Sequence, residues 1–308
     1  MLIYRGIPAH SDTPVALTIG NFDGIHLGHQ AMLARLVKAA RELRLPSCVM
    51  TFEPHPREVF TPEAAPARLT SLREKLELLA DYGVDRTYIL RFNRQFAQLG
   101  ADDFIRDLLY RRLQARWVLI GDDFRFGAKR AGDLHLLEQL GGELGIQVAS
   151  MHSIVHDELR VSSTAVREAL ADGQLELAAR LLGRPYSISG RVVHGDKAGR
   201  EFGYPTANIQ LKHNKPPLAG IFAVKLCGLD GTELPGAASL GIRPTVKQNG
   251  KPTLEVHVFD FDRQIYGEHV RVDFYHKLRD EKKFAGLDEL IAAIGQDVKD
   301  AKAFFLNR

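Results

Sequence analysis

Residues 20–29 constrain the fold of this 308-residue chain more than any other stretch. The apolar run Val15–Ile19 precedes them and predicts a short buried strand, and an amphipathic pattern over residues 30–43 predicts a helix. Where a strand passes through a glycine-rich turn into a helix, backbone N–H groups and the positive end of the helix dipole face one spot. The sequence therefore predicts a phosphate site at this turn.

Two histidines strengthen that prediction. His26 and His29 stand three residues apart where the turn becomes the helix, so they can lie on one face and reach the same ligand. Each can donate a hydrogen bond to a phosphate oxygen without a metal. The alternative is a pair of solvated loop histidines beside turn glycines. A single histidine would favour that alternative, whereas two, framed by Gly24 and Gly28, favour phosphate chemistry.

The first 180 or so residues alternate between strand and helix patterns. We expect further strands at 47–52, 87–90, 117–120 and 147–150, and helices at 71–82, 102–113 and 134–144. Such alternation with short connections predicts a parallel sheet covered on both faces. Ligands bind such sheets beyond the carboxyl ends of the strands. The histidine turn, residues 54–56 and residues 121–127 all fall there.

Hydroxyl side chains open the next predicted helix. Ser162, Ser163 and Thr164 are followed one turn later by Arg167, and together they could hold an anion. Plain N-capping is the alternative, and it would be favoured for this segment taken alone. With the histidine turn upstream, the anion site is the better interpretation.

The pattern changes near residues 183–186. Short strand-like pieces at 186–193, 221–226, 253–259 and 269–274 are separated by turns rather than helices, and a helix is expected at 287–305. Strands of this length and spacing predict an antiparallel sheet or a small barrel. We therefore expect two domains, 1–183 and 184–308.

The second domain has polar residues of its own. Gly195, Gly199 and Gly203 would let backbone approach a phosphate, and Thr206 and Asn208 offer oxygen ligands to a hard cation such as Mg²⁺. A P-loop is excluded because Asp196 stands where that motif requires lysine. Glu255 lies on a strand of alternating apolar residues; it either faces solvent or serves as a base, and the alternation alone favours solvent.

Composition excludes several classes of protein. Hydrophobic residues make up 45% and charged residues 26% of the chain, as in soluble globular proteins, and the net charge of +3 is too small to indicate nucleic-acid binding. Cys48 and Cys227 lie far apart without metal-ligand spacing, which favours a reduced compartment. No signal-peptide core or run of transmembrane length is evident. We expect a cytoplasmic protein.

These motifs together resemble one known family, the bacterial bifunctional riboflavin kinase/FAD synthetases. Gly-Asn-Phe-Asp-Gly-Ile-His-Leu-Gly-His at 20–29 resembles the family's HxGH adenylyltransferase signature, and residues 122–127 and 162–167 resemble its next two nucleotide segments. Gly-Tyr-Pro-Thr-Ala-Asn at 203–208 and Glu-Val-His at 255–257 resemble its kinase module. Departures are mild: Asp123 stands where some members carry asparagine, and Val161 replaces a common isoleucine. The resemblance spans nearly the whole chain.

The resemblance implies an α/β plus β protein: a Rossmann-like HxGH nucleotidyltransferase domain, then a six-stranded antiparallel β-barrel with a terminal helix. The barrel would phosphorylate riboflavin from ATP to give FMN. The first domain would join FMN to the AMP part of a second ATP, giving FAD and pyrophosphate. Mg²⁺ would accompany ATP. Riboflavin, FMN and ATP would be the partners of a monomer or weak homo-oligomer, without nucleic acid or membrane.

The resemblance also assigns candidate residues. His26, His29 and Glu255 would carry catalysis, with Glu255 as the kinase base and Thr206 and Asn208 as ligands of Mg²⁺. Flavin would lie against Phe52, Pro54 and Pro56 in the first domain, although a plain turn explains the prolines almost as well. The ATP site of the first domain would comprise Gly20, Asn21, Phe22, Asp23, Gly24, His26, His29, Gly121, Asp123, Ser162, Ser163, Thr164 and Arg167. The ATP site of the barrel would comprise Gly195, Lys197, Gly199, Gly203, Thr206 and Asn208.

Other functions compete with this one. An HxGH adenylyltransferase for another phosphorylated substrate would not need the barrel motifs. A class I aminoacyl-tRNA synthetase would need a Lys-Met-Ser-Lys-Ser-like loop, which the sequence lacks. A catalytically inactive flavin-binding or RNA-binding regulator would not need intact His26, His29 and Glu255, and the sequence has no basic stripe with interleaved aromatic residues.

Overall fold

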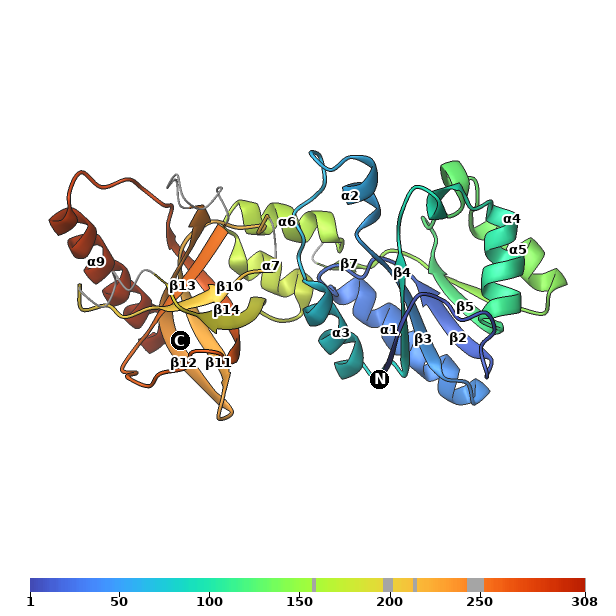
Figure 1. The fold of residues 1–308 in the computed structure, drawn as a ribbon, viewed down its shortest axis with the longest axis horizontal. Coiled ribbons are helices and arrows are strands. Elements are labelled where there is room, and N and C mark those ends of the chain that lie inside the picture. Colours follow the sequence, from blue (N-terminus) through green and yellow to red (C-terminus); the bar gives the residue numbers. More distant parts are fainter. Residues whose placement is uncertain (157–158, 196–201, 213–214, 243–251, 308) are drawn as a thin grey trace. The chain divides into compact units, whose positions relative to one another are not determined.

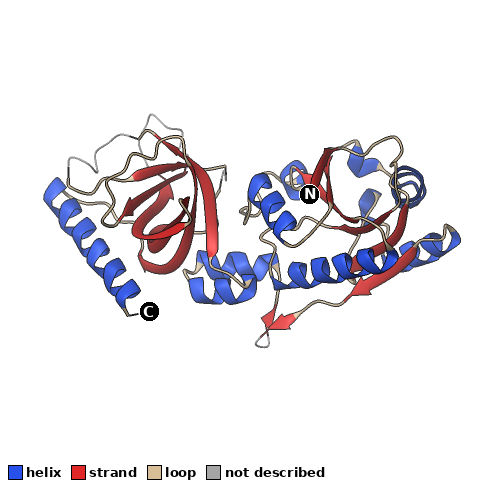
Figure 2. Ribbon diagram, turned by 90° about the horizontal axis from the view of Figure 1, so that it is seen from below, coloured by secondary structure: helices blue, strands red, loops and turns tan. Residues whose placement is uncertain are grey.

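The chain forms two compact units (Figure 1). The computed structural model describes residues 1–156, 159–195, 202–212, 215–242 and 252–307. The first unit comprises Met1–Pro66 and Leu72–Val161, and the second comprises Ala67–Ser71 and Ser162–Arg308. Helices accompany the strands of the first unit, whereas strands dominate the barrel of the second (Figure 2).

The first unit is built on a six-stranded parallel sheet, which confirms the predicted architecture. In spatial order the strands are β1 (Leu2–Arg5), β4 (Arg86–Arg91), β3 (Ser47–Glu53), β2 (Val15–Ile19), β5 (Ala115–Gly121) and β6 (Gln147–Met151). The edge strand β1 was not expected. It is short and mostly exposed, so its sequence carries little hydrophobic pattern, and pairing with β4 supplies its hydrogen bonds.

Helices bury both faces of this sheet. On β2, Val15 and Leu17 join the core that packs against η2 (Phe104–Arg112) and α5 (Leu134–Glu143), whereas Ala16 joins the core beneath α1 (Leu27–Leu43) and α3 (Leu72–Asp81). Alternate residues of one strand therefore serve opposite layers. A strand buried on both sides reads as the continuous apolar run seen in the sequence.

Several local details differ from the sequence-based expectations. α1 begins at Leu27 rather than residue 30, because His26 acts as its N-cap. The helix expected at 102–113 is a short α-helix, α4 (Ala101–Asp103), followed by the π-helix η2, which ends with the Leu113 N–H donating to the Leu108 carbonyl. The remaining elements were too short to show a period: α2 (Pro56–Phe60), η1 (Phe96–Gln98), η3 (Ala128–Arg130), β7 (Val155–His156) and β8 (Leu159–Arg160).

The second unit begins with two helices and continues as a closed antiparallel barrel, which confirms the predicted small barrel. The helices are α6 (Ser163–Ala171) and α7 (Leu175–Leu182), and α7 packs on the barrel. In spatial order the barrel strands are β10 (Ala207–Gln210), β13 (Pro252–Val258), β12 (Thr232–Ile242), β11 (Gly220–Leu229), β14 (His269–Arg279) and β9 (Tyr186–Val193). The domain boundary at residue 183 stays a prediction.

The terminal helix α9 (Leu287–Leu306) lies along the outside of the barrel (Figure 1). Small side chains make room for it: Ala223 and Ala237 of the barrel wall pack with Ala301 of the helix. Arg279 adds a bidentate pair, with both nitrogen-to-oxygen distances to buried Asp297 at 2.7 Å. Across the described residues, every helix is too short or too polar to cross a bilayer.

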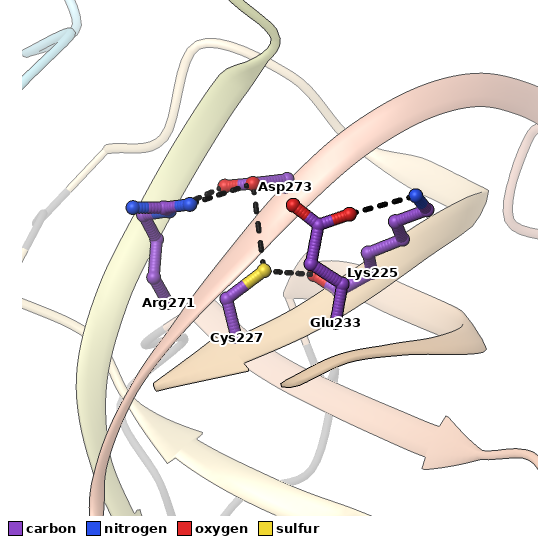
Figure 3. Close-up of polar contacts among 5 residues, drawn as sticks. All are labelled: Lys225, Cys227, Glu233, Arg271 and Asp273. Carbon is purple, nitrogen blue, oxygen red and sulfur yellow. Dashed lines mark hydrogen bonds and ion pairs between the residues drawn. The ribbon is translucent and has the colours of Figure 1, made fainter. Parts of the chain in front are cut away.

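A polar network covers another part of the barrel wall (Figure 3). Arg271 donates to both oxygens of buried Asp273, at 2.7 and 3.0 Å, and the Cys227 thiol lies 3.6 Å from the same carboxylate. Burial, reinforced by the negative charge of Asp273, raises the pKa of Cys227 to about 11. The thiol therefore stays protonated at neutral pH. Beside it, Lys225 pairs with Glu233 at 2.8 Å in a more exposed position.

The two ion pairs of this wall should differ in their contribution to stability. Asp273→Ala should cost roughly 1.5–3 kcal/mol, since it removes the charged acceptor of Arg271 and leaves the Cys227 thiol with the Lys225 carbonyl alone. Lys225→Met should cost less than about 1 kcal/mol, because its partner is solvated. Urea unfolding followed by circular dichroism measures the loss of unfolding free energy in each variant. Trp117, the only tryptophan, lies in the first unit, so its fluorescence follows the unfolding of that unit as an internal control. Equal losses for the two variants would contradict this assignment.

Candidate functional sites

The histidine turn, residues 20–29, is held in an unusual backbone conformation. Phe22, Gly24 and Ile25 have φ values of 48°, 83° and 40°. Left-handed φ in non-glycine residues costs about 1–3 kcal/mol each and persists where packing enforces it. Phe22 and Ile25 are fully buried in the core beneath α1, which supplies that packing. The turn is therefore rigidly attached to the core.

The two histidine rings are stacked at the start of α1. Their centroids lie 3.7 Å apart with 18° between the planes. His26 is the N-cap, and its Nδ1 accepts a hydrogen bond from the His29 backbone N–H at 3.4 Å. A Cβ on Gly28 would lie 3.2 Å from the His26 ring, so glycine permits this close approach. Since Nδ1 is an acceptor, the proton of neutral His26 lies on Nε2.

His29 is kept neutral by its surroundings. Burial lowers its pKa well below the usual range, and the nearby His26 and Lys75 lower it further. Its ring also tilts against Phe22, with centroids 4.9 Å apart. Among the described residues, His29 Nδ1 and the side-chain oxygen of Asn21 are buried polar atoms without a hydrogen-bond partner. The turn thus holds two buried polar atoms whose hydrogen-bonding capacity is unused.

Lys75 was missed by the sequence analysis. Its side chain is buried on α3, and Nζ lies 3.5 Å from the Thr51 hydroxyl, which in turn donates to the Asn21 carbonyl at 3.3 Å. A hydrogen-bonded chain thus connects a buried ammonium group to the histidine turn. Its sequence signal was a lysine four residues before Leu79, on the apolar face of the helix.

An aromatic cluster forms at the carboxyl ends of β3 and β4 and consists of Phe52, Phe60, Phe92 and Phe96. Phe52 contacts Phe92 and Phe96 with centroid distances of 5.8 Å, and Phe60 contacts Phe92 at 5.6 Å. Pro54 and Pro56 lie between β3 and the body of α2, and the Glu53–Pro54 peptide bond is cis. Phe92 and Phe96 were not singled out, although Phe92 follows a predicted strand at the same sheet edge.

The loop after β5 carries two carboxylates that already have partners. Asp123 pairs with Arg160 at 2.6 Å, and Asp122 pairs with His152 at 2.9 Å. The hydrogen bond from His152 lowers the pKa of Asp122. Gly121 ends β5 directly before this pair.

Residues 162–167 open α6 in the second unit. Ser162 is the N-cap, and its hydroxyl accepts from the Ala165 N–H at 3.1 Å, so the capping interpretation describes this residue correctly. Arg167 donates to the Ala67 carbonyl at 2.6 Å, while Ser163 and Thr164 lie in the first turn. Joint action of these residues with the histidine turn stays a prediction.

The barrel site consists of Thr206, Asn208 and Glu255. Strand register sets Asn208 opposite Glu255, and the Thr206 hydroxyl donates to the Glu255 carboxylate at 3.4 Å. A Cβ on Gly195 would collide with the Asn208 amide, so glycine is required for this approach. Gly203 lies in the turn before Thr206. Lys197 and Gly199 lie outside the described residues.

A cavity of about 290 Å³ adjoins Thr206 in the second unit. Its walls are mostly apolar, and charged and aromatic residues of the segment after β13 complete them. Ligand pockets commonly combine apolar walls with a few polar groups. The lining residues are Val192, Pro205, Thr206, Ala207, Val256, Val258, Phe261, Asp262, Arg263, Gln264, Ile265 and Tyr266.

Metal chemistry at the barrel site would depend on oxygen ligands. Throughout the described part of the chain, no three His, Cys, Asp or Glu side chains form a metal-binding group. The Thr206 hydroxyl and the Asn208 amide are oxygen donors of the kind that Mg²⁺ accepts beside substrate phosphates. The donor set therefore fits a cation that arrives with a nucleotide.

Two family models match the chain in succession. Residues 9–165 match the FAD synthetase family, and residues 182–305 match the riboflavin kinase family. The first match contains the histidine turn and the second contains the barrel site. Most of the first match lies in the first compact unit, and the whole of the second match lies in the second unit.

Curated relatives extend over nearly the whole chain. Bifunctional riboflavin kinase/FMN adenylyltransferases of Escherichia coli K12 and Haemophilus influenzae are 49% and 48% identical to it, covering 99% and 94% of this chain and 98% and 94% of their own. A solved structure from Streptococcus pneumoniae, described as a macrolide-efflux protein, aligns with a TM-score of 0.81 and 31% identity, covering 96% of this chain and 97% of its own. The chain belongs to the family of bifunctional riboflavin kinase/FMN adenylyltransferases.

Proposed function

We propose that the two reactions of this family take place at two separate sites of the chain. FMN adenylylation is assigned to the histidine turn, and riboflavin phosphorylation is assigned to the barrel site. The observation that carries the assignment is the stacked pair His26–His29 at the start of α1. Independent support comes from the Thr206–Glu255 contact on the barrel.

Adenylyl transfer needs charge stabilisation more than a base, because the FMN phosphate already carries the attacking oxygen. That oxygen attacks the α-phosphorus of ATP, and the bond to the leaving pyrophosphate breaks. His26 and His29 would donate N–H groups to the phosphate oxygens at the positive end of α1. The neutral state of His29 suits a hydrogen-bond donor that does not act as an acid. Its buried neighbour Lys75 would add positive charge, the same charge that lowers the pKa of His29.

The rest of the ATP site would come from the surrounding loops. Gly20, Asn21, Phe22, Asp23 and Gly24 would form the wall around the nucleotide, supported by the buried side-chain oxygen of Asn21, which has no hydrogen-bond partner among the described residues. Further contacts are proposed for Gly121, Asp123, Ser162, Ser163, Thr164 and Arg167. Asp123 would reach ATP only by sharing its carboxylate with Arg160.

The flavin ring of FMN is proposed to lie against the aromatic cluster near Pro54 and Pro56. Within the cluster Phe52 has one edge-on partner, Phe92, and one tilted partner, Phe96, and Phe60 is 56% exposed. A planar ring packs well on such a surface. This position is at the carboxyl ends of the strands, where parallel sheets bind ligands.

Phosphoryl transfer on the barrel needs a base. Glu255 would accept the proton of the terminal ribityl hydroxyl of riboflavin as its oxygen attacks the γ-phosphorus of ATP and ADP leaves. Thr206 and Asn208 would hold Mg²⁺, which when bound neutralises phosphate charge. Gly195, Lys197, Gly199 and Gly203 are proposed to line the phosphates.

Several broader properties are also proposed. The catalytic modules are assigned to residues 1–183 and 184–308. Family membership supports riboflavin, FMN and ATP as small-molecule partners. The modest net charge of +3 supports a protein that works without nucleic acid. A monomer or weak homo-oligomer in the cytoplasm completes the proposal.

The activity itself can be tested with riboflavin and Mg-ATP alone. Chromatography should show FMN first and then FAD, because the product of the barrel is the substrate of the first module. Formation of neither flavin product would overturn the proposed function.

Glu255→Gln should lower FMN formation by about 10²–10⁴-fold, the usual contribution of a positioned base. Adenylylation of added FMN should stay within twofold of wild type. Glu233→Gln, also in the barrel but paired with Lys225, is the matched control and should retain both activities. Near-normal riboflavin kinase turnover in Glu255→Gln would refute the assignment of the base.

His29→Ala should lower FAD formation from FMN by about 10²–10³-fold, because one donor to the transition state is lost. Riboflavin phosphorylation should continue unchanged. His135→Ala, on the exposed side of α5, makes the same change outside the site. Equal loss of both activities in folded His29→Ala would contradict two independent sites.

The neutral state of His29 should appear as an acid dependence of stability. The unfolded chain takes up a proton on this residue below about pH 6.5, whereas the folded chain does not, so folding weakens as pH falls. His29→Gln removes that contribution. Relative to wild type, the free energy of unfolding of the variant should rise by up to about 1.4 kcal/mol for each pH unit below pH 6.5. Urea unfolding followed by Trp117 fluorescence measures this difference. A constant difference between pH 7.5 and 5.5 would show that His29 titrates normally.

A further inference from the structure

His257 has no role in the reaction described so far, although it lies two residues after Glu255 on β13. Residues two apart on a strand share a face, so both side chains lie on the side opposite the buried Leu254 and Val256. His257 is part of no proton transfer proposed above. Its Nδ1 lies 2.9 Å from the carbonyl oxygen of Pro205, the residue directly before Thr206.

This bond replaces a missing part of the strand ladder. β10 pairs with β13 from Ala207 onward, with Ala207 opposite Val256. Pro205 has no N–H, so the backbone ladder cannot continue regularly through it. The His257 side chain reaches across and binds the Pro205 carbonyl instead. The segment that carries Thr206 is thereby attached to β13 by a side chain.

The His257 ring is itself fixed by neighbours. Tyr204 meets it edge-on with centroids 5.5 Å apart and 83° between the planes, and Phe259 meets it at 5.9 Å and 64°. Phe259 is buried in the cluster under α9. A ring held by two aromatic contacts keeps its orientation without help from a substrate. These two contacts therefore hold the ring with Nδ1 directed at the Pro205 carbonyl oxygen.

Among the described residues, two polar side-chain contacts thus join β13 to Pro205 and Thr206. One is the Thr206–Glu255 contact at 3.4 Å, and the other is the His257–Pro205 bond. The first must be given up or shared when Glu255 takes the proton of the substrate hydroxyl. The second does not involve a reacting group and can persist through the reaction.

We infer that His257 is a positioning residue for phosphoryl transfer. By donating Nδ1–H to the Pro205 carbonyl, it holds Thr206 in place while Glu255 accepts the proton of the substrate hydroxyl. This inference rests on the proposed role of the barrel site. A carbonyl oxygen only accepts, so the bond requires hydrogen on Nδ1. It forms with the Nδ1–H tautomer of the neutral ring and equally with the charged ring.

The test uses a pair of substitutions that differ in where they place a donor. His257→Asn carries an amide nitrogen close to the position of Nδ1, whereas His257→Leu has similar bulk and no donor. In the full chain, riboflavin kinase kcat should fall about 10–100-fold in His257→Leu, because displacements of about 1 Å at a reacting centre cost this much. His257→Asn should stay within about threefold of wild type. Adenylylation of added FMN should be unchanged in both.

The inference is overturned if His257→Leu keeps wild-type kinase activity, or if His257→Asn loses as much as His257→Leu. Glu255→Gln is assayed alongside to distinguish failure of this inference from failure of the proposed barrel site. If the barrel site is wrongly assigned, Glu255→Gln keeps its kinase activity; if only the role of His257 is wrong, Glu255→Gln is inactive. A second measurement reads the hydrogen-bond donor directly in the wild-type chain. Nitrogen-15 NMR of the wild-type chain should show hydrogen on Nδ1 of His257, with His257→Asn used to identify its signals. An Nε2–H tautomer would contradict the inference.

Discussion

The hydrogen bond between His26 Nδ1 and the His29 backbone N–H is the interaction on which the first module depends. It caps α1, fixes the tautomer of His26 and brings the two rings to 3.7 Å. One nitrogen of His26, Nδ1, thus belongs to the helix cap. His26 thus caps the first turn of α1 and also places an imidazole ring at the positive end of the helix dipole. The cost of the left-handed turn before it is met by burying Phe22 and Ile25.

The barrel site is built differently. Strand register, rather than a helix terminus, places Asn208 opposite Glu255. A closed barrel leaves no sheet edge, so this register cannot slip without disrupting the whole wall. The segment just before Ala207 lies outside the ladder that joins β10 to β13. That segment carries Thr206, which explains why an additional side-chain bond from His257 matters there.

Sequence patterns predicted these sites and the architecture to different degrees. The doubly buried strand Val15–Ile19 and the β–α alternation identified the parallel sheet, because its strands are continuous apolar runs. The surroundings of Glu255 were harder to predict. The alternation of β13 indicated that its side chain lies opposite the buried face and favoured exposure to solvent, whereas in the structure its carboxylate contacts Thr206. β10 and the contact of Lys75 with Thr51 were not predictable locally, because each depends on partners distant in the chain.

The central claim is that one chain carries two independent transfer sites, and mixing two single-site variants tests it most directly. Glu255→Gln and His29→Ala each lack one step. An equimolar mixture of the two, supplied with riboflavin and Mg-ATP, should form FAD after a lag in which FMN accumulates. The double variant should form none. Failure of the mixture to form FAD, although each variant retains its other activity, would contradict separate sites linked by released FMN.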